Sequence, residues 1–574
     1  MNAEMTCRLW ADSPVLTQSE KERVLTVMKD PELCAMNFSG PMSFGTAGLR
    51  SKMDVGPGCM NIHTVAHITQ AIASLILREG AADRGVAIAY DSRHLSADFA
   101  RTAAQVLAAC GIRVFLFDDI RPTPELSFAI RELGCIAGIN ITASHNPKEY
   151  NGYKAYWEDG AQVAPAQADA ISALAAGIDI LTGAVKADFE ESVKAGVITM
   201  LGTDFDEKYL DAVMKTAIRP DAVHRVADSL KIVYSPLHGA GRRLVPEVMR
   251  RIGLHCIYPV MSQMTPDGDF PTVKKPNPEY ADVFTDGIAI AEKVGSDLII
   301  ATDPDADRIG VMCRGRDGRF FTVTGNQMGA LLLDYVIRAA REAGTLTPDD
   351  YAVKSIVSTD MADCICKKQG VRLYSVPTGF KYIGEVIKNY ESEGKPGRFL
   401  IGFEESYGYL FGTYARDKDA VGAALMICEM TAWYAEKGMT LGDALKALYA
   451  EYGLYREGLI DIYMEGYDGI EKRKRTMAKL RENTPASIGG VKVKAAADFA
   501  CGTERVLATG EEHPSALSGL DVLFYTMEND DKIVVRPSGT EPKIKMYLLC
   551  HGDDAESLAR KIDAYAADVR TFAD

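Results

Sequence analysis

One local pattern occurs three times along the chain and restricts the fold more than any other feature. Each copy consists of a short apolar strand, a polar turn, an amphipathic helix, a Gly and a second apolar strand. The opening strands are expected at residues 86–90, 232–234 and 355–357, the helices at residues 96–110, 244–251 and just after residue 360, and the closing strands at 114–117, near 256 and at 371–374. Since Gly111, Gly253 and Gly370 follow the helices, where a left-handed residue is favoured, each copy predicts a βαβ unit.

The spacing of the copies indicates separate domains. They lie more than 100 residues apart, whereas solenoid repeats have periods of roughly 20–50 residues. A chain of 574 residues is long enough for about four domains. We therefore expect three related mixed α/β domains at residues 1–202, 203–320 and 321–445. A C-terminal α+β domain is expected at 446–574, because strands near 534–535 and 544–549 precede a helix from 555 to about 567.

Composition narrows the possible partners. The net charge of −15 argues against a nucleic-acid binder, although a few local cations are enough to bind one small anion. The N-terminus lacks the apolar segment of a signal peptide, and no run approaches the roughly 18 apolar residues of a membrane span, so a cytoplasmic protein without a membrane partner is expected. Of the 12 Cys residues only Cys364 and Cys366 lie close together, which favours reduced thiols over a zinc site.

A trio of carboxylates directly after an apolar strand is the strongest chemical signal. Asp303, Asp305 and Asp307 alternate along the loop, which allows them to converge on one cation, and oxygen ligands select Mg²⁺ or Ca²⁺. An EF-hand is excluded because Arg308 and Arg314 occupy the positions that require Gly and Glu. A solvated acidic turn is the alternative.

A second polar loop, Thr142-Ala143-Ser144-His145-Asn146-Pro147, also follows an apolar strand. It lacks the flanking Gly residues of a nucleophile elbow, so a Ser-His hydrolase is not implied, and a turn with a capping Ser is the alternative. Lys154 and Lys381 each follow a Gly-containing turn and are candidates for acid/base work if they are desolvated, whereas a lone Lys is usually a solvated surface residue.

Three further loops contain polar or charged side chains that could bind a ligand. Residues 536–545 combine cations, hydroxyls and Gly, as an anion cradle does, although a plain turn would look similar. Residues 402–408 contain carboxylate and hydroxyl acceptors at alternate positions, which suit vicinal hydroxyls. Residues 44–50 form a Gly-rich loop that ends in Arg50 and does not match a P-loop.

In this order the motifs resemble those of the α-D-phosphohexomutase superfamily, in its phosphoglucomutase/phosphomannomutase family and the long branch of it. The family has a serine loop of TASHNP type, a metal loop of D-x-D-x-D-R type, a sugar loop of G-E-x-S type and a phosphate loop of R-x-S-G-T type. All four occur here between residues 44 and 545. The resemblance implies four domains around a central cleft, the first three of them related α/β units.

The resemblance also implies a role for each matching residue. Ser144 matches the serine that is phosphorylated in the active enzyme. The expected catalytic set is Ser144, His145, Lys154, Arg308 and Lys381. The expected metal ligands are Ser144, Asp303, Asp305 and Asp307, around one Mg²⁺ per chain. The expected substrate-binding residues are Arg50, Glu404, Ser406, Arg536, Ser538, Gly539, Thr540 and Lys545.

The implied activity is the interconversion of α-D-glucose 1-phosphate and glucose 6-phosphate through a phosphoserine and a bound glucose 1,6-bisphosphate. The only expected partner is the small sugar phosphate, with the chain as a monomer or dimer. Phe403 departs from the Gly usual before the sugar-loop Glu, Glu405 favours glucose, and the FGTAGLR loop favours a pentose. Phosphomannomutase, phosphopentomutase, metal-dependent sugar phosphatase and silent binding scaffold are the alternatives.

Overall fold

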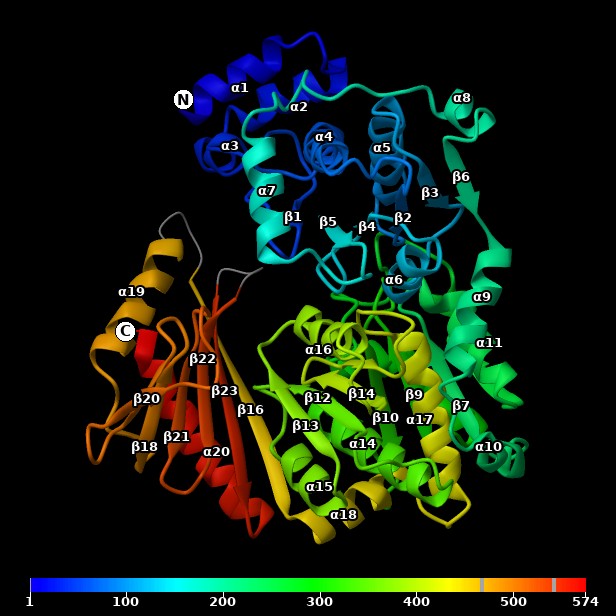
Figure 1. Ribbon diagram of the computed structural model, residues 1–574, viewed down its shortest axis with the longest axis vertical. Helices are drawn as coiled ribbons and strands as arrows, with labels where there is room; N and C mark the ends of the chain where they lie inside the picture. Colours follow the sequence, from blue (N-terminus) through cyan, green and yellow to red (C-terminus); the bar gives the residue numbers. More distant parts are fainter. Residues whose placement is uncertain (1, 465–468, 539–542, 574) are drawn as a thin grey trace.

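The computed structural model describes residues 2–464, 469–538 and 543–573, and its strands form four separate sheets (Figure 1). We name the parts of the chain that contain them the first, second, third and fourth units. Among the helices of the described residues, none has the length and apolar character that crossing a membrane requires.

The first unit has a six-stranded sheet in the order β1-β5-β4-β2-β3-β6. Its strands are β1 (Leu49–Lys52), β2 (Val86–Tyr90), β3 (Val114–Phe117), β4 (Ala137–Ile141), β5 (Tyr150–Trp157) and β6 (Ile198–Leu201). Its helices are α1 (Ala3–Asp12), α2 (Gln18–Val27), α3 (Pro31–Phe38), α4 (Ile62–Arg78), α5 (Ser96–Ala109), α6 (Thr123–Glu132), α7 (Pro165–Ala175) and α8 (Phe189–Lys194). The strands β2, β3, β4 and β6 run parallel, and β5 runs antiparallel to both of its neighbours, β4 and β1.

The second unit repeats this plan with five strands in the order β11-β10-β9-β7-β8. They are β7 (Lys231–Ser235), β8 (Cys256–Pro259), β9 (Leu298–Thr302), β10 (Ile309–Arg314) and β11 (Phe320–Val323). The helices that lead into and belong to it are α9 (Thr203–Met214), α10 (Pro220–Val226), α11 (Gly241–Arg251), α12 (Met261–Met264), η1 (Ala281–Phe284) and α13 (Thr285–Val294).

The third unit has four strands in the order β13-β12-β14-β15. They are β12 (Tyr351–Ser355), β13 (Arg372–Val376), β14 (Phe399–Glu404) and β15 (Gly408–Leu410). Its helices are α14 (Gly325–Glu342), α15 (Met361–Gln369), α16 (Phe380–Ser392), α17 (Ala420–Ala435) and α18 (Leu441–Tyr452). The helix α17 packs against α10 and α11, so one apolar core runs through the first three units.

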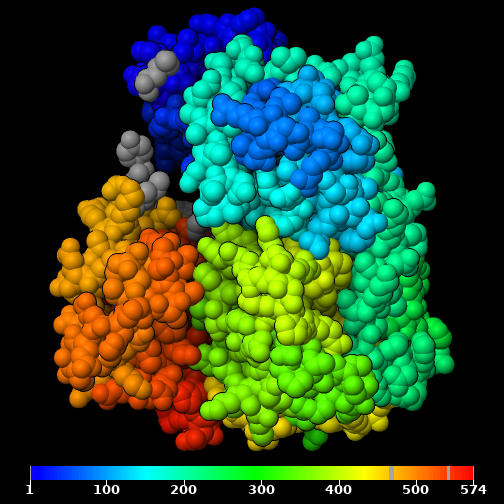
Figure 2. Space-filling model, in the orientation of Figure 1, coloured from blue at the N-terminus to red at the C-terminus, as the bar shows by residue number. Residues whose placement is uncertain are grey.

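The fourth unit is built around an antiparallel sheet and lies beside the third, below the first, as Figure 2 shows in orange and red. Its strands are β16 (Leu454–Tyr463), β17 (Ser487–Ile488), β18 (Val491–Asp498), β19 (Thr503–Val506), β20 (Glu512–Pro514), β21 (Leu523–Met527), β22 (Lys532–Pro537) and β23 (Lys543–Gly552). Its helices are α19 (Gly469–Glu482), α20 (Ala555–Arg570) and η2 (Thr571–Ala573). It has a core of its own.

The three predicted βαβ units are present. The strand pairs β2/β3, β7/β8 and β12/β13 are parallel and each is joined through a helix, and the three closing Gly residues have φ of +72°, +106° and +72°. The position of the third opening strand was wrong: β12 ends at Ser355, so Ile356 and Val357 lie beyond it. Val357 is buried with apolar residues of the fourth unit, which explains why a β-branched pair lies outside the strand.

Each of the first three units also contains the same hairpin. A strand of its parallel set, β4, β9 or β14, runs into a polar loop and returns as the antiparallel strand β5, β10 or β15. Ligands bind at the carboxyl ends of such strands. Each loop has one non-glycine residue with positive φ, namely Ser144 at +51°, Ala306 at +49° and Tyr407 at +66°. Backbone strain of this kind concentrates at functional sites.

Candidate active site

A buried ionic pair holds the loop that contains Ser144. The Arg93 guanidinium donates to the carbonyl oxygens of Ser144 and Asn146, and further to Pro147 (2.9 Å) and Tyr150 (3.1 Å). Its counter-ion is the Asp91 carboxylate, whose side chain is equally inaccessible to solvent. Charge-assisted hydrogen bonds from Arg93, which are stronger than neutral ones, therefore hold the backbone of the serine loop in place.

The Ser144 hydroxyl meets the aspartate trio. Its Oγ donates to Asp303 Oδ2 over 2.7 Å, and His145 Nδ1 lies 3.1 Å from the same Oγ. Burial, together with the Arg308 and Arg50 guanidinium groups, holds the pKa of His145 well below its usual range. His145 is therefore a neutral hydrogen-bond partner of the hydroxyl at physiological pH.

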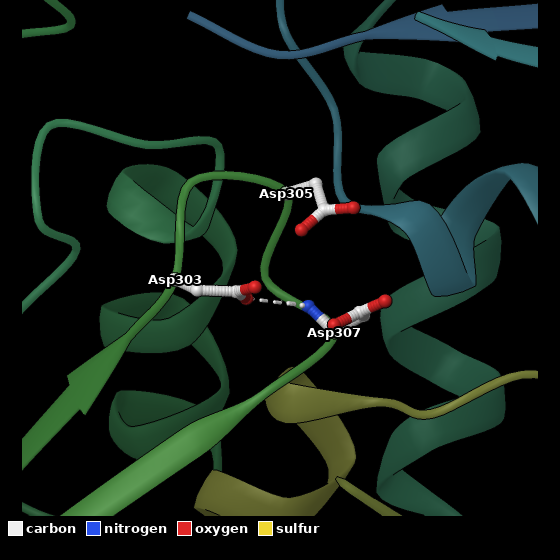
Figure 3. Close-up of side chains that lie close together, drawn as sticks. All are labelled: Asp303, Asp305 and Asp307. Carbon is white, nitrogen blue, oxygen red and sulfur yellow. Dashed lines mark hydrogen bonds between the residues drawn. The ribbon is translucent and has the colours of Figure 1, made fainter. Parts of the chain in front are cut away.

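The three carboxylates gather around the β9–β10 loop (Figure 3). Asp303 Oδ1 accepts from the backbone N–H groups of Asp307 (3.1 Å) and Arg308 (3.0 Å), which closes the loop. One oxygen of Asp305 and one of Asp307, the Oδ1 atom in each case, are buried without a hydrogen-bond partner among the described residues. Ligand oxygens of all three residues lie within 4.8 Å of one another. Orphaned carboxylate oxygens converging at this spacing fit a hard cation.

The electrostatics of the trio also favour a bound cation. Burial raises the pKa of Asp303 well above its ordinary value, and the adjacent Asp305 and Asp307 carboxylates raise it further. Three buried carboxylates repel one another when all are ionised. A bound cation would remove that penalty.

Two buried lysines offset part of the negative charge. Lys154 Nζ, on β5, lies 2.7 Å from Asp305 Oδ2 and 3.3 Å from Asp307 Oδ2. Lys418 Nζ, from the third unit, lies 3.1 Å from Asp307 Oδ2 and 2.8 Å from Asp417. Burial lowers the pKa of both ammonium groups, but the neighbouring carboxylates raise it more, so both stay charged.

The two predicted arginines flank the serine loop. Arg308 Nη1 donates to Glu279 Oε1 over 2.6 Å, and Arg50 Nη1, on β1, donates to Asn146 Oδ1 over 3.2 Å. The Glu279 carboxylate therefore orients the Arg308 side chain from outside the loop. Both guanidinium groups lower the pKa of His145, the residue next to Ser144, so both lie near the serine loop.

The sugar loop ends β14 with a buried carboxyl. Glu404 accepts from the Gly379 N–H over 2.6 Å, and burial with the adjacent Glu405 raises its pKa to about 7. Glu405 accepts from Ser355 Oγ over 3.1 Å, and Ser406 is half-buried. Phe403 is fully buried, and a Cβ on Gly329 would lie 2.4 Å from its ring. Phe403 is thus a core residue of the third unit.

Lys381 and the end of β22 lie near the same side chain, Tyr382. The Lys381 ammonium lies 4.8 Å from the centre of the Tyr382 ring at the start of α16. Burial raises the pKa of Tyr382, and the positive charge of Arg536 opposes this shift, so the end of β22 faces the same region. Arg536 is paired in register with Lys545 on β23, and Ser538 donates its N–H to the Lys543 carbonyl oxygen over 2.8 Å. Gly539 and Thr540 lie outside the described residues.

Several residues of the site were not anticipated. Asp91 and Arg93 lie in the polar turn predicted after the first opening strand, and that turn follows β2, the parallel neighbour of β4, beside the serine loop. Lys418 belongs to the charged run Arg416–Asp419, directly before the apolar helix α17, and the whole run is buried. Four consecutive charged residues directly before an apolar helix could have indicated a buried cluster of charges. The sequence around Glu279 has no comparable signal of a role in the site.

The comparisons with known proteins agree with this geometry. Three family models match, described as phosphoglucomutase/phosphomannomutase alpha/beta/alpha domains I, II and III, over residues 41–180, 207–317 and 324–452. Phosphoglucomutase of Staphylococcus epidermidis is 37% identical over 525 residues, which are 91% of this chain and 93% of that protein. Phosphoglucomutase of Staphylococcus aureus is 35% identical over 532 residues, or 92% and 93% of the two chains.

Solved structures share the fold. A putative phosphomannomutase from Thermus thermophilus superposes with a TM-score of 0.67 at 23% identity, over 93% of this chain and 99% of the other. The open form of parafusin, a phosphoglucomutase from Paramecium, gives 0.67 at 19% identity, over 93% and 96%. The chain therefore belongs to the phosphoglucomutase/phosphomannomutase family of the α-D-phosphohexomutase superfamily.

Proposed function

We propose that this enzyme interconverts α-D-glucose 1-phosphate and glucose 6-phosphate through a phosphorylated Ser144 and a bound glucose 1,6-bisphosphate. The observation that carries the proposal is the 2.7 Å contact between Ser144 Oγ and the Asp303 carboxylate, inside a cluster of three acids and two lysines. The glucose preference follows the phosphoglucomutases that the chain resembles over more than 90% of its length.

The residues present fit a Mg²⁺ ion. We expect Asp303, Asp305 and Asp307 to hold it with an oxygen of Ser144 or its phosphate, because the donor set is oxygen only and two of the carboxylate oxygens are buried without a partner. When bound, the ion supplies positive charge that offsets the negative charge of the phosphoryl group.

The chain's own side chains have separable tasks in this proposal. The ammonium groups of Lys154 and Lys418 stay protonated and stabilise negative charge next to the phosphoryl group, so neither serves as the base that accepts the hydroxyl proton. Arg308 and Arg50 stand on the serine-loop side, where phosphoryl oxygens would project. The neutral His145 orients the Ser144 hydroxyl.

In the first half-reaction the bond between phosphorus and the Ser144 oxygen breaks, a bond to the 6-oxygen of the sugar forms, and the 6-hydroxyl proton passes to the Ser144 oxygen. In the second half-reaction the 1-phosphoryl group moves to Ser144, the serine proton passes to the 1-oxygen of the sugar, and glucose 6-phosphate leaves. The two steps balance, since one phosphoryl group leaves the serine and one comes back.

The sugar and its second phosphate are assigned to the third and fourth units. Glu404 and Ser406 accept the sugar hydroxyls, and burial of the Glu404 carboxyl supports this role because its ionised form needs a hydrogen-bonded partner. Arg536, Ser538, Gly539, Thr540 and Lys545 hold the phosphate that does not react. We assign domains to residues 1–202, 203–320, 321–445 and 446–574, with the second and third extended so that β11 and α18 stay whole. The last domain closes over the substrate to exclude water.

The test is a comparison of kcat/KM for glucose, mannose, glucosamine and ribose 1-phosphates, with Mg²⁺ and a bisphosphate activator. Glucose 1-phosphate should be preferred. A higher value for mannose or ribose would replace the assignment with phosphomannomutase or phosphopentomutase, and free phosphate in place of isomer would indicate a phosphatase. Ser144→Ala should lower turnover more than about 1,000-fold while sugar-phosphate binding persists. Unchanged turnover would remove Ser144 from the reaction.

A further inference from the structure

A threonine from the first unit contacts the metal loop of the second. Thr123 begins α6, between two prolines, and is completely buried. Its N–H donates to the Asp305 carbonyl oxygen over 2.8 Å, and its hydroxyl donates to Asp305 Oδ2 over 2.9 Å. In Figure 3 the blue segment that passes Asp305 leads into this helix. One residue thus fixes both the backbone and the carboxylate of Asp305.

The direction of the Thr123 hydroxyl is itself fixed. Asn140 Nδ2 donates to Thr123 Oγ1 over 2.7 Å, and Asn140 is completely buried on β4. Because that donor occupies an acceptor site of the oxygen, the single hydroxyl hydrogen is left for the carboxylate. Since β4 continues into the loop of Ser144, the same strand supports both the serine and, through Thr123, the metal loop.

The two oxygens of Asp305 are used differently. Oδ2 accepts from Thr123 and from Lys154 Nζ (2.7 Å), so both of its in-plane acceptor positions are taken. Oδ1 is buried and has no hydrogen-bond partner within the described part of the chain. Oδ1 is therefore the oxygen of Asp305 that would be left to bind a cation at the trio.

We propose that Thr123 is a positioning residue that restricts Asp305 to a single ligand oxygen and thereby favours Mg²⁺ over Ca²⁺ at the trio. Mg²⁺ requires near-octahedral geometry with short bonds to single oxygens, whereas Ca²⁺ accepts more ligands and often takes a carboxylate through both oxygens. Loss of the Thr123 donor would free one acceptor position of Oδ2, while Lys154 keeps the other, and would so allow the two-oxygen arrangement. This inference rests on the proposed function only in taking the trio as the cation site.

The test is calorimetric titration of the metal-stripped full-length enzyme with Mg²⁺ and, separately, with Ca²⁺. Thr123→Val removes the hydroxyl at nearly constant volume, and Thr123→Ser is the matched control that keeps it. We expect the ratio of the Ca²⁺ Kd to the Mg²⁺ Kd to fall about tenfold in the Val variant, the usual size for loss of a hydrogen bond to a metal ligand. The Ser variant should keep the wild-type ratio. An unchanged ratio for Val, or equal behaviour of Ser and Val, overturns the inference.

Two further titrations separate the possible failures. Asp303→Asn should abolish binding of both cations; if it binds Mg²⁺ like the wild type, the trio is not the cation site and the proposed function fails with it. If Asp303→Asn loses binding but Thr123→Val keeps the wild-type ratio, only the role of Thr123 is wrong. Should Thr123→Val not fold, Asn140→Ala leaves the threonine in place and removes the donor that directs it. The same shift in cation preference is then expected, and its absence refutes the inference.

Discussion

Replacing Arg93 by Met should separate the stability of the first unit from its catalytic power. Arg93 is buried without solvent contact and its guanidinium bonds the carbonyl oxygens of the serine loop. Removing it leaves the Asp91 carboxylate buried and unpaired, which costs about 3–5 kcal/mol of unfolding free energy. Each lost hydrogen bond is worth about 1.5–3 kcal/mol in isolation, but this energy cannot simply be added to the cost of the unpaired carboxylate. We therefore expect a total loss of about 4 kcal/mol at pH 8.

The pH dependence of this loss is predictable. Burial raises the pKa of Asp91 even when Arg93 is present, and without the arginine it should rise further. A protonated Asp91 carries no unpaired charge, so the penalty of Arg93→Met should shrink as the pH falls. The double variant Asp91→Asn/Arg93→Met removes the charge outright. Its amide oxygen can take the place of Oδ1, which accepts from the residue-93 N–H and the Ser96 hydroxyl, and its NH2 group can donate to Thr142 Oγ1. It should recover most of the lost stability.

Activity should not recover in the same way. The Ser144 backbone loses its support in both variants, and a misplacement of about 1 Å at a reacting group can cost about 100-fold in rate. The assays are urea denaturation for stability and a coupled assay of glucose 6-phosphate formation for kcat/KM. The reasoning is refuted if Arg93→Met keeps kcat/KM within about threefold of the wild type, or if the double variant regains activity together with stability.

Other predictions concern the sugar loop and the lysines. Because burial raises the pKa of Glu404 from 4.5 to about 7, the stability contributed by its protonated form is complete below about pH 4.5 and lost as the pH rises through about 7. Over the same pH range kcat/KM should rise, because the ionised Glu404 binds the sugar. Glu404→Gln should abolish this rise. The control is Glu457→Gln: burial also raises the pKa of the Glu457 carboxyl to about 7, but its loss should leave the pH dependence of kcat/KM unchanged. A Cβ at residue 408 would lie 2.2 Å from Lys418 Cδ, so Gly408→Ala should move that ammonium and lower kcat/KM at least about tenfold, with Mg²⁺ affinity as a second readout. Lys418→Met should leave Asp307 and Asp417 short of a counter-charge and destabilise the fold by about 3–5 kcal/mol, measured in urea.

The repeated βαβ pattern could be predicted because periodicity and a glycine at each helix end are local properties. The sequence placed Ser144 and Asp303 each just after an apolar strand, but these strands belong to different sheets, so only the resemblance to the family implied that the two residues meet. The misplaced third strand shows the limit of propensity. Val357 is β-branched, but burial against the fourth unit decides its conformation.

Pair contacts between distant segments could not be predicted from the sequence. Thr123, Glu279 and Lys418 occur in runs that also suit an ordinary helix start, a loop and a charged turn. Each of them belongs to the site because it contacts one residue more than 25 positions away in the sequence. These partners are Asp305 for Thr123, Arg308 for Glu279 and Asp307 for Lys418. Only tertiary packing creates such pairs.

The origin of the charges explains why the site needs three units. The serine and Lys154 come from the hairpin of the first unit, the acids from the equivalent hairpin of the second, and Lys418 from the third. Separate units would each bury part of the charge without its counter-ions, and burying unpaired charge is costly. The shared apolar core that joins the three units brings the opposite charges together. The fourth unit has a core of its own and meets the shared core through the half-buried Tyr455 of β16, so the contact between Ser144 and Asp303 does not depend on it.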